Sequence, residues 1–310
     1  MLWKYCKRWV DTLKGELCYY LERYGLKEYG DPVNFGSLDS SPEAIQRDVD
    51  YAINNAHFWL SLLPNDGEFL KGKKVLEIGP GLNFGAMLIL ACHGAEVMVA
   101  DRFLPPWDPG YHPKFYDLLK KTCANQWPSL DLSPLDMVIS QGKYPSKVIS
   151  LYSCPLEKIS VVPDTTLDIV LSNAVLEHIY DLKSASYHLA RITKPGGFGI
   201  HMVDFRDHRD FSRPLEYLIM REVKFYGRFK AKQGEIGNRY RPQEMQELLE
   251  LAGFEVREFV PHIFTDEDYL TEFLERLRQA RESRYHDYPA EDLRCLGGRF
   301  ILARITHEKL

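Results

Sequence analysis

The sequence of 310 residues lacks several features that would assign it to a specialised class of protein. It has no apolar run near the roughly 20 residues that a membrane-spanning helix needs. Its first residues, MLWKYCKRW, lack the apolar segment of a secretory signal. The six cysteines are scattered and contain no C-x-x-C pair, which argues against a zinc ribbon or a small disulfide framework. We therefore expect a reduced, cytoplasmic protein with no membrane partner.

A strong charge of one sign is also missing. The 39 Lys and Arg residues face 44 Asp and Glu residues, so the formal net charge is −5. Such a chain has no general attraction for nucleic acid or anionic lipid. Repeats and low-complexity tracts are absent as well, and 45% of the residues are hydrophobic. This composition suits one elaborated domain or two small ones around a large core.

The most informative segment runs from Val75 to Asp101. The apolar run VLEI enters a glycine-rich turn, GPGLNFG, and a helical pattern follows. A second apolar run, EVMVA, then ends at Asp101. A strand–turn–helix–strand unit of this kind holds an adenosine-containing ligand against the backbone.

Two adenosine ligands compete for this unit. A dinucleotide is usually bound through G-x-G-x-x-G, but here Gly85 follows Gly79 and Gly81 one residue late. Glu77 would repel a pyrophosphate and attract the α-ammonium group of S-adenosylmethionine (SAM). Asp101 follows the second strand, where an acid accepts hydrogen bonds from ribose hydroxyls. The pattern favours SAM over a nicotinamide dinucleotide.

Two further segments extend the pattern. They are LDIVLSNAVLEH at 167–178 and RITKPGGFGIH at 191–201. With the glycine turn and Asp101, they span about residues 71–205, and the chain resembles the class I SAM-dependent methyltransferases. The resemblance implies an α/β fold, a Rossmann-like seven-stranded, mostly parallel sheet with helices on both faces. It also implies SAM as cofactor and S-adenosyl-L-homocysteine as product, and it is nearly silent about the methyl acceptor.

The rest of the chain is organised around this core. We expect an N-terminal helical cap at 1–70 and a SAM-binding methyltransferase domain at 71–310, with lid insertions at about 104–146, 206–240 and 265–292. Ser41 and Pro42 predict the start of a helix, and another helix is expected at 242–252. A charged helix at 266–286 would separate the last two strands. Apolar runs predict strands at 74–78, 96–100, about 147–151, 167–172, 198–204, 254–260 and 298–305.

The resemblance and the motifs together predict a set of cofactor-binding residues. For Phe84, cofactor contact and core packing are equally open, and for Glu157 a surface position is as open as adenine contact. The predicted cofactor-binding residues are Glu77, Gly79, Pro80, Gly81, Asn83, Phe84, Asp101, Arg102, Leu156, Glu157, Ser172, Asn173 and Ala174.

Methyl transfer requires the protein to align a nucleophile and, where needed, to remove its proton. Candidate groups follow the fourth and fifth strands, because open α/β sheets bind ligands at that edge. We predict Asp204 and His208 as an acid–base pair and His201 as a second candidate base. His178, a residue type that titrates near neutral pH, is either a base or a structural histidine.

Residues 206–241 hold ten Lys and Arg against five Asp and Glu, a local excess of +5 (10 − 5). This excess would attract a phosphate- or carboxylate-bearing acceptor, or it forms a solvated lid face. The predicted substrate-binding residues are Glu177, Arg206, Tyr226, Arg239 and Arg241.

Some enzymes of the resembling family hold a divalent ion with E-x-x-E-H and a distant histidine. Here Ala174 occupies the first glutamate position, so the set is incomplete and we expect no metal. We predict an enzyme that methylates an oxygen or nitrogen of a polar small molecule, a sugar, glycan or natural product, without a nucleic-acid partner. A SAM-binding scaffold without activity, an NAD(P)-dependent oxidoreductase and a homodimeric state stay open.

Overall fold

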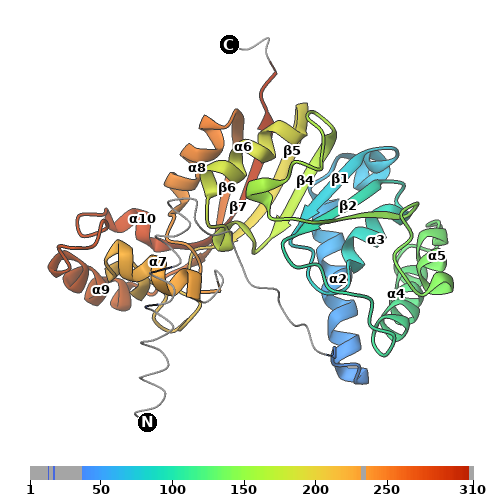
Figure 1. Cartoon of the computed structure of the whole chain (residues 1–310), viewed down its shortest axis with the longest axis horizontal. Helices are drawn as coiled ribbons and strands as arrows, with labels where there is room; N and C mark the ends of the chain where they lie inside the picture. Colours follow the sequence, from blue (N-terminus) through green and yellow to red (C-terminus); the bar gives the residue numbers. More distant parts are fainter. Residues whose placement is uncertain (1–12, 14–16, 18–36, 232–234, 307–310) are drawn as a thin grey trace. The chain divides into compact units, whose positions relative to one another are not determined.

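The computed structural model of the chain describes residues 13, 17, 37–231 and 235–306. Seven strands form one sheet in the order β3-β2-β1-β4-β5-β7-β6, and Figure 1 labels the strands other than β3. β1 pairs in parallel with β2 and with β4, and β2 pairs in parallel with β3. The predicted α/β fold with a seven-stranded, mostly parallel sheet is confirmed. The strands are β1 (Lys74–Ile78), β2 (Glu96–Asp101), β3 (Ile149–Ser153), β4 (Leu167–Asn173), β5 (Thr193–Asp204), β6 (Phe254–Phe264) and β7 (Cys295–Arg304).

Helices connect the strands. None of those in the described part of the chain combines the length and the apolarity that a bilayer-spanning helix requires. The longer helices are α2 (Pro42–Ser61), α3 (Gly85–Cys92), α4 (His112–Gln126), α5 (Ser133–Gln141), α6 (Leu182–Ile192), α7 (Glu222–Ala231), α8 (Pro242–Leu251), α9 (Glu267–Gln279) and α10 (Ala290–Arg294). Short 3₁₀ helices are η1 (Pro64–Leu70), η2 (Leu156–Lys158), η3 (Leu176–His178) and η4 (Glu216–Ile219).

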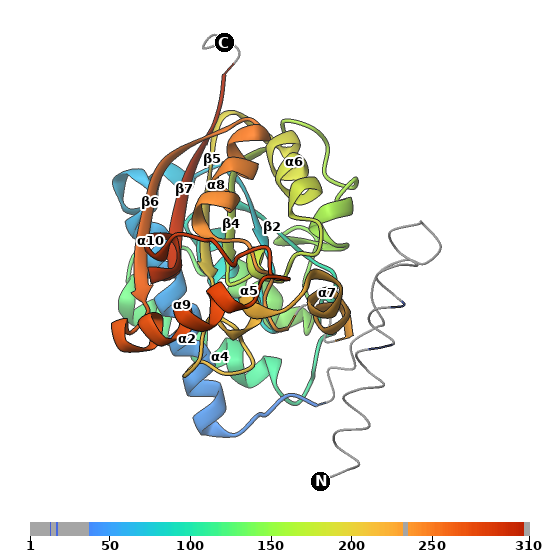
Figure 2. The same cartoon turned by 90° about the vertical axis from the view of Figure 1, so that its left-hand side faces the viewer.

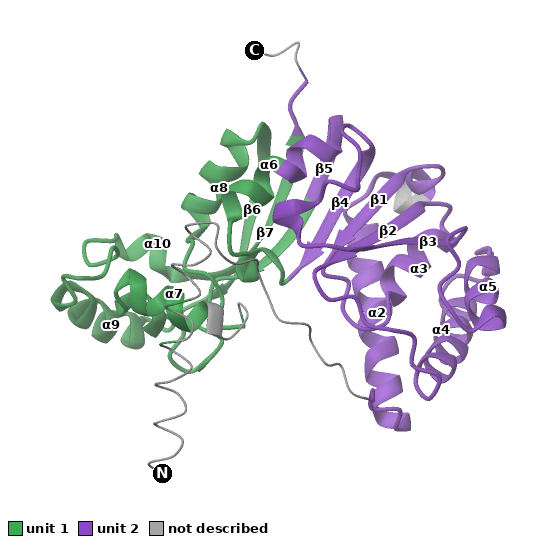
Figure 3. Cartoon of the chain, in the orientation of Figure 1, with its two compact units in different colours: residues 1–31, 174–187, 200–303 green, residues 32–173, 188–199, 304–310 purple. Residues whose placement is uncertain are grey.

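The chain divides into two compact units, coloured in Figure 3. Among the residues described from Ser37 onward, unit 1 contains 174–187 and 200–303, and unit 2 contains the rest. The division passes through β5, which contributes to both units. The domain boundary predicted at residue 70 stays a prediction.

Unit 2 contains α2, whose start and apolar face are as the sequence predicts. The Ser41 Oγ accepts a hydrogen bond from the Ala44 N–H at 3.3 Å, and Pro42 occupies the first turn, where its missing N–H costs nothing. One side of α2, including Val49, Ala56 and Trp59, is fully buried, and the helix packs against α3 and α4. The helix indicated by apolar residues near Trp3 lies outside the described residues, apart from Leu13 and Leu17.

The segment 104–146, predicted only as a lid insertion, contains α4 and α5. These helices pack against each other and against α3. Phe115, Leu119 and Leu135 are fully buried in this region. The segment is therefore part of the core of unit 2 as well as an insertion in the strand pattern.

Strand boundaries differ from the predicted ones where glycine or polar residues occur inside a strand. β5 begins at Thr193, five residues before the predicted start, and runs through Gly196 and Gly197. A Cβ at Gly197 would lie 2.9 Å from the Asp168 carbonyl oxygen, so glycine permits the close backbone approach. β3 starts two residues later than predicted, and β6 extends four residues further.

Unit 1 has an apolar core of its own, formed by residues from both later insertions. α9 packs against η4 and α10, and Figures 1 and 2 show α9 beside α10. The charged helix expected at 266–286 ends at Gln279, after an N-cap at Asp266. The core residues are Leu215, Tyr217, Leu218, Phe225, Phe229, Ile236, Leu270, Phe273, Leu277, Tyr285, Leu293 and Leu296.

Candidate functional site

A cavity of about 200 Å³ lies in unit 2 where β1 and β4 end. The strand order reverses at this point, because β1 pairs with β2 on one side and with β4 on the other. Open α/β sheets bind their ligands at such a switch point. The cavity is lined by Tyr51, Ala52, Asn55, Glu77, Gly79, Pro80, Gly81, Asn83, Gly85, Ala86 and Asn173.

The glycine turn contributes backbone to this cavity. Gly79 and Gly81 have φ angles of 67° and 73°, a region that side-chain-bearing residues rarely adopt. A Cβ at Gly81 would meet nothing within 4 Å, so backbone conformation and not crowding explains this glycine. The turn places bare backbone along the cavity wall.

Glu77 is the charged residue of the cavity wall. Its side chain is 4% exposed, and burial raises the pKa of the carboxyl to about 8. A cationic ligand group beside Glu77 would favour the ionised form again. The ammonium group of SAM has the required charge, and a pyrophosphate has the opposite one.

Asn83 holds the turn in place through its side chain. Its Oδ1 accepts a hydrogen bond from the Gly85 N–H at 3.0 Å, and its Nδ2 donates to the Tyr111 hydroxyl at 3.1 Å. Tyr111 in turn donates to Asp48 Oδ2 at 2.9 Å, and Tyr116 donates to the Asn83 carbonyl oxygen. These hydrogen bonds thus connect the glycine turn to α2 and α4.

Three residues from α2, Tyr51, Ala52 and Asn55, line the cavity and were missed from the sequence. The Asn173 Nδ2 donates to the Tyr51 hydroxyl at 3.0 Å and to Asn55 Oδ1 at 3.4 Å. Polar residues at i, i+3 and i+7 on a mainly apolar helix, here Asp48, Tyr51 and Asn55, were the available signal.

The other predicted cofactor residues lie outside the wall of this cavity. Asp101 ends β2, and its Oδ1 accepts a hydrogen bond from the Phe103 N–H at 2.7 Å; burial raises its pKa, although that bond and Arg102 oppose the rise. Phe84 is buried with its ring centroid 4.7 Å from that of Tyr144. Arg102 follows β2, Leu156 and Glu157 form η2, and Ser172 and Ala174 flank the end of β4.

Unit 1 contains a second group of chemically active residues. Glu177 and His178 end η3, and His208 follows β5. One possible ligand atom from each residue lies within 4.8 Å of those of the other two. The ring centroids of His178 and His208 are 5.0 Å apart. Glu177 is 1% exposed, and burial raises its pKa to about 8.

Asp204 lies beside His208, at a distance longer than a hydrogen bond, and their role as an acid–base pair stays a prediction. The Asp204 Oδ2 is 3.6 Å from His208 Nε2, and Arg206 Nη2 is 2.6 Å from the same oxygen. Burial acts to raise the pKa of Asp204, but the contacts with His208 and Arg206 outweigh it and hold the pKa well below its usual range. Asp204 is therefore an anion that can orient the imidazole.

The remaining predicted base, His201, lies inside β5 and is fully buried. Burial lowers its pKa to about 4, so the ring is neutral at physiological pH. Complete burial favours a structural position over direct contact with an acceptor.

The predicted substrate residues other than Glu177 also lie in unit 1, where Arg239 and Arg241 are buried and Arg206 and Tyr226 are half-buried. Arg206 is paired with Asp204, and the Tyr226 ring packs edge-on against Phe225 at 5.4 Å. Arg239 donates to the Met220 carbonyl oxygen at 2.5 Å and lies over the Phe225 ring at 4.1 Å.

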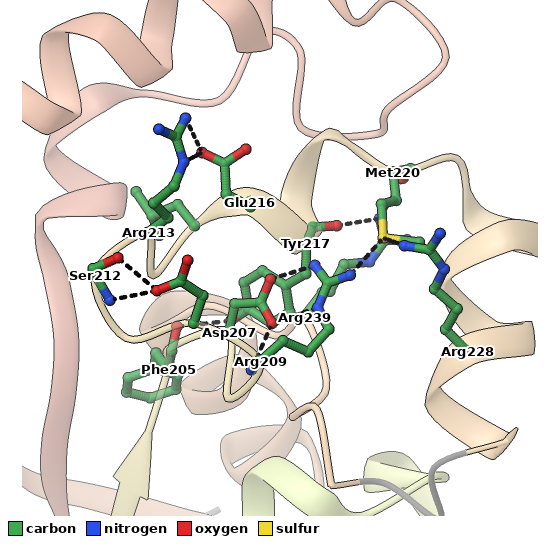
Figure 4. Close-up of polar contacts among 12 residues, drawn as sticks. Phe205, Asp207, Arg209, Ser212, Arg213, Glu216, Tyr217, Met220, Arg228 and Arg239 are labelled. Atoms are coloured by element: carbon green, nitrogen blue, oxygen red, sulfur yellow. Dashed lines mark hydrogen bonds and ion pairs between the residues drawn. The ribbon is translucent and has the colours of Figure 1, made fainter. Parts of the chain in front are cut away.

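Arg241 is fully buried and donates to the carbonyl oxygens of Phe205 and Cys295. Figure 4 shows Arg239 close to Tyr217 and Met220. Nearby, the Tyr217 hydroxyl donates to the Phe205 carbonyl oxygen at 2.7 Å. Arg239 and Arg241 donate hydrogen bonds to backbone carbonyl oxygens. This favours a structural role for both residues over substrate contact.

Comparison with known proteins identifies a protein family that the chain matches. A family model described as a methyltransferase domain matches residues 45–258, whereas no curated protein matches the chain. Among solved structures, an S-adenosylmethionine-dependent methyltransferase from Mesorhizobium loti is 16% identical, with 83% of this chain and 100% of that chain covered and a TM-score of 0.47.

A geranyl diphosphate C-methyltransferase from Streptomyces coelicolor A3(2), solved with Mg²⁺, geranyl diphosphate and S-adenosyl-L-homocysteine, is 11% identical. The likeness covers 89% of this chain and 92% of that chain at a TM-score of 0.46. These values are too low for the substrates of either enzyme to indicate a substrate of this chain.

Proposed function

Because the chain belongs to the methyltransferase-domain family, we propose that it transfers the methyl group of SAM to an oxygen or nitrogen of a polar small molecule. The observation that carries the proposal is the cavity at the switch point of the sheet, with buried Glu77 in its wall. A cationic ligand group beside this buried carboxyl would favour its ionised form and be attracted to it. A pyrophosphate would favour the neutral form and gain no such attraction.

The residues of the cavity would hold the methionine end of SAM. Glu77 would meet the ammonium group, and the glycine turn would allow the ligand close to the backbone. Asp101 would accept hydrogen bonds from the ribose hydroxyls. When bound, SAM supplies an activated methyl group, and the protein supplies alignment of the acceptor.

For the acceptor side we propose the group formed by Glu177, His178, Asp204 and His208. It combines a buried carboxyl, two imidazoles and an anion that orients one of them. Such a group can hold an acceptor hydroxyl or amine and accept its proton. We propose a sugar, glycan or natural product as the acceptor, and a cytoplasmic enzyme without a nucleic-acid partner.

Calorimetric titration of the full chain tests the cofactor. SAM and S-adenosylhomocysteine should bind one per chain, and NADH and NADPH should not bind. Binding of a nicotinamide dinucleotide with no binding of SAM would overturn the proposal.

An assay for S-adenosylhomocysteine release against pooled metabolites tests the activity. Release that depends on an added pool supports a methyltransferase. SAM binding without release in any pool, sugars and natural products included, would favour the scaffold.

A further inference from the structure

We propose that Glu177, His178 and His208 bind one divalent ion of a first-row transition metal, such as Mn²⁺, Fe²⁺, Co²⁺ or Zn²⁺. The use of this ion in methyl transfer rests on the proposed function, but its binding does not. The proposal replaces the expectation, drawn from the incomplete glutamate motif, that the chain has no metal site.

The first support is the juxtaposition of three donors of the right type. Two imidazoles and one carboxylate come from two segments, η3 and the turn after β5, and their possible ligand atoms all lie within 4.8 Å of one another. Two atoms that each bind one ion at about 2.1 Å are at most roughly 4.2 Å apart. Small side-chain rotations would therefore bring all three ligand atoms within bonding distance of one ion.

The second support is an unsatisfied oxygen inside the group. The Glu177 Oε1 accepts a hydrogen bond from the Asp204 N–H at 3.2 Å. The Oε2 is buried and has no hydrogen-bond partner among the described residues. A buried polar atom without a partner costs free energy, and a cation at this position would remove that cost.

The third support is the surroundings of His208. Asp204 lies 3.6 Å from its Nε2, and an outer carboxylate of this kind commonly orients a metal-binding histidine. Arg206 donates hydrogen bonds to Asp204 through both Nε and Nη2. This pairing neutralises much of the positive charge of Arg206 near the proposed ion. The Phe211 ring, 5.5 Å from the His208 ring, adds an apolar neighbour.

The ligand set also indicates the kind of ion and its use. Imidazole nitrogens suit transition metals, whereas Mg²⁺ and Ca²⁺ prefer oxygen ligands. Three protein ligands leave coordination positions open, and an ion there would lower the pKa of a hydroxyl beside it. With the imidazoles bound to the ion, the acceptor hydroxyl would lose its proton to solvent instead of to His178 or His208. Its oxygen would bond to the methyl carbon, and the carbon–sulfur bond would break to leave S-adenosylhomocysteine. The site thus favours oxygen over nitrogen as the methylated atom.

Titration of the metal-stripped full chain with Co²⁺ tests the site, read by calorimetry and by the visible absorption of the bound ion. We expect one ion per chain, with at least tenfold weaker binding in Glu177→Gln and His208→Ala. His262→Ala, which removes an exposed histidine of β6 in the same unit, should bind as the wild type does. Excess Mg²⁺ should not displace Co²⁺.

The wild-type titration alone can overturn the site, even where a variant fails to fold. Absence of saturable Co²⁺ binding in wild type would refute it, as would wild-type affinity in folded His208→Ala. SAM binding in EDTA without a Co²⁺ site overturns the metal site and leaves the proposed function. One-to-one Co²⁺ binding to a chain that does not bind SAM supports the site and overturns the function.

Discussion

At the scale of single residues, Glu77 should affect both the stability of the fold and the binding of SAM. Its pKa is about 8 in the folded chain because the side chain is buried, whereas an unfolded glutamate titrates near 4.5. The folded state therefore holds a proton that the unfolded state releases between these values. By linkage, this residue's contribution to stability is complete below about pH 4.5 and is lost as the pH rises through about 8.

Glu77→Gln should remove this pH dependence. We expect the variant and the wild type to have similar free energies of unfolding at pH 5, and the ligand-free variant to be more stable at pH 8.5, by on the order of 3 kcal/mol. Urea unfolding at the two pH values measures the difference. Glu177 is present in both proteins, so its similar titration cancels.

The same variant should bind SAM about 10–100-fold more weakly, because hydrogen bonds to charged groups contribute about 1.5–3 kcal/mol. A variant of unchanged affinity would remove Glu77 from the ammonium site, whatever its effect on stability.

At the scale of elements, the hydrogen bonds of Tyr111 connect α2, α4 and the glycine turn. The Tyr111 hydroxyl links Asp48 to Asn83, and Asn83 holds the Gly85 N–H. The loop conformation includes Phe84 at a φ of 54°, which is uncommon for a residue with a side chain. Hydrogen bonds from side chains outside the glycine turn are the physical reason that the turn keeps this conformation.

Tyr111→Phe should therefore weaken SAM binding severalfold as well as lower stability by about 1–2 kcal/mol. Tyr217→Phe is the matched control, since it removes a buried hydroxyl that donates to the Phe205 carbonyl in unit 1. The control should lose similar stability and keep its SAM affinity. Equal SAM affinity in both variants would show that the Tyr111 hydroxyl stabilises the fold without positioning the loop.

At the scale of the whole molecule, β5 contributes residues to both compact units. Neither unit can keep its part of the sheet order if this strand unfolds. We therefore expect one cooperative unfolding transition for the described chain.

Scanning calorimetry with SAM tests this expectation. SAM at 100 times its dissociation constant should raise the stability of the whole transition by about 2.7 kcal/mol. Two transitions, of which SAM shifts one, would contradict the expectation and identify unit 2 as an independent folding unit.

The accuracy of the sequence prediction varied along the chain for physical reasons. β1, β2 and β4 were placed to within one residue at either end because each is mainly apolar, as expected for buried parallel strands. α2 was predicted from its N-cap and apolar face. The helices α4 and α5 were not, because proline, tryptophan and tyrosine interrupt the pattern between 104 and 146.

The sequence by itself determined the strand–turn–helix–strand unit, the sheet built around it and the family, because these depend on local periodicity and on glycines at fixed spacing. Only the tertiary structure decided that α2 lines the cavity, that Arg239 and Arg241 bond to backbone carbonyls, and that His208 meets Glu177 and His178. Those facts depend on contacts between residues far apart in the chain, and local sequence patterns carry no information about such contacts.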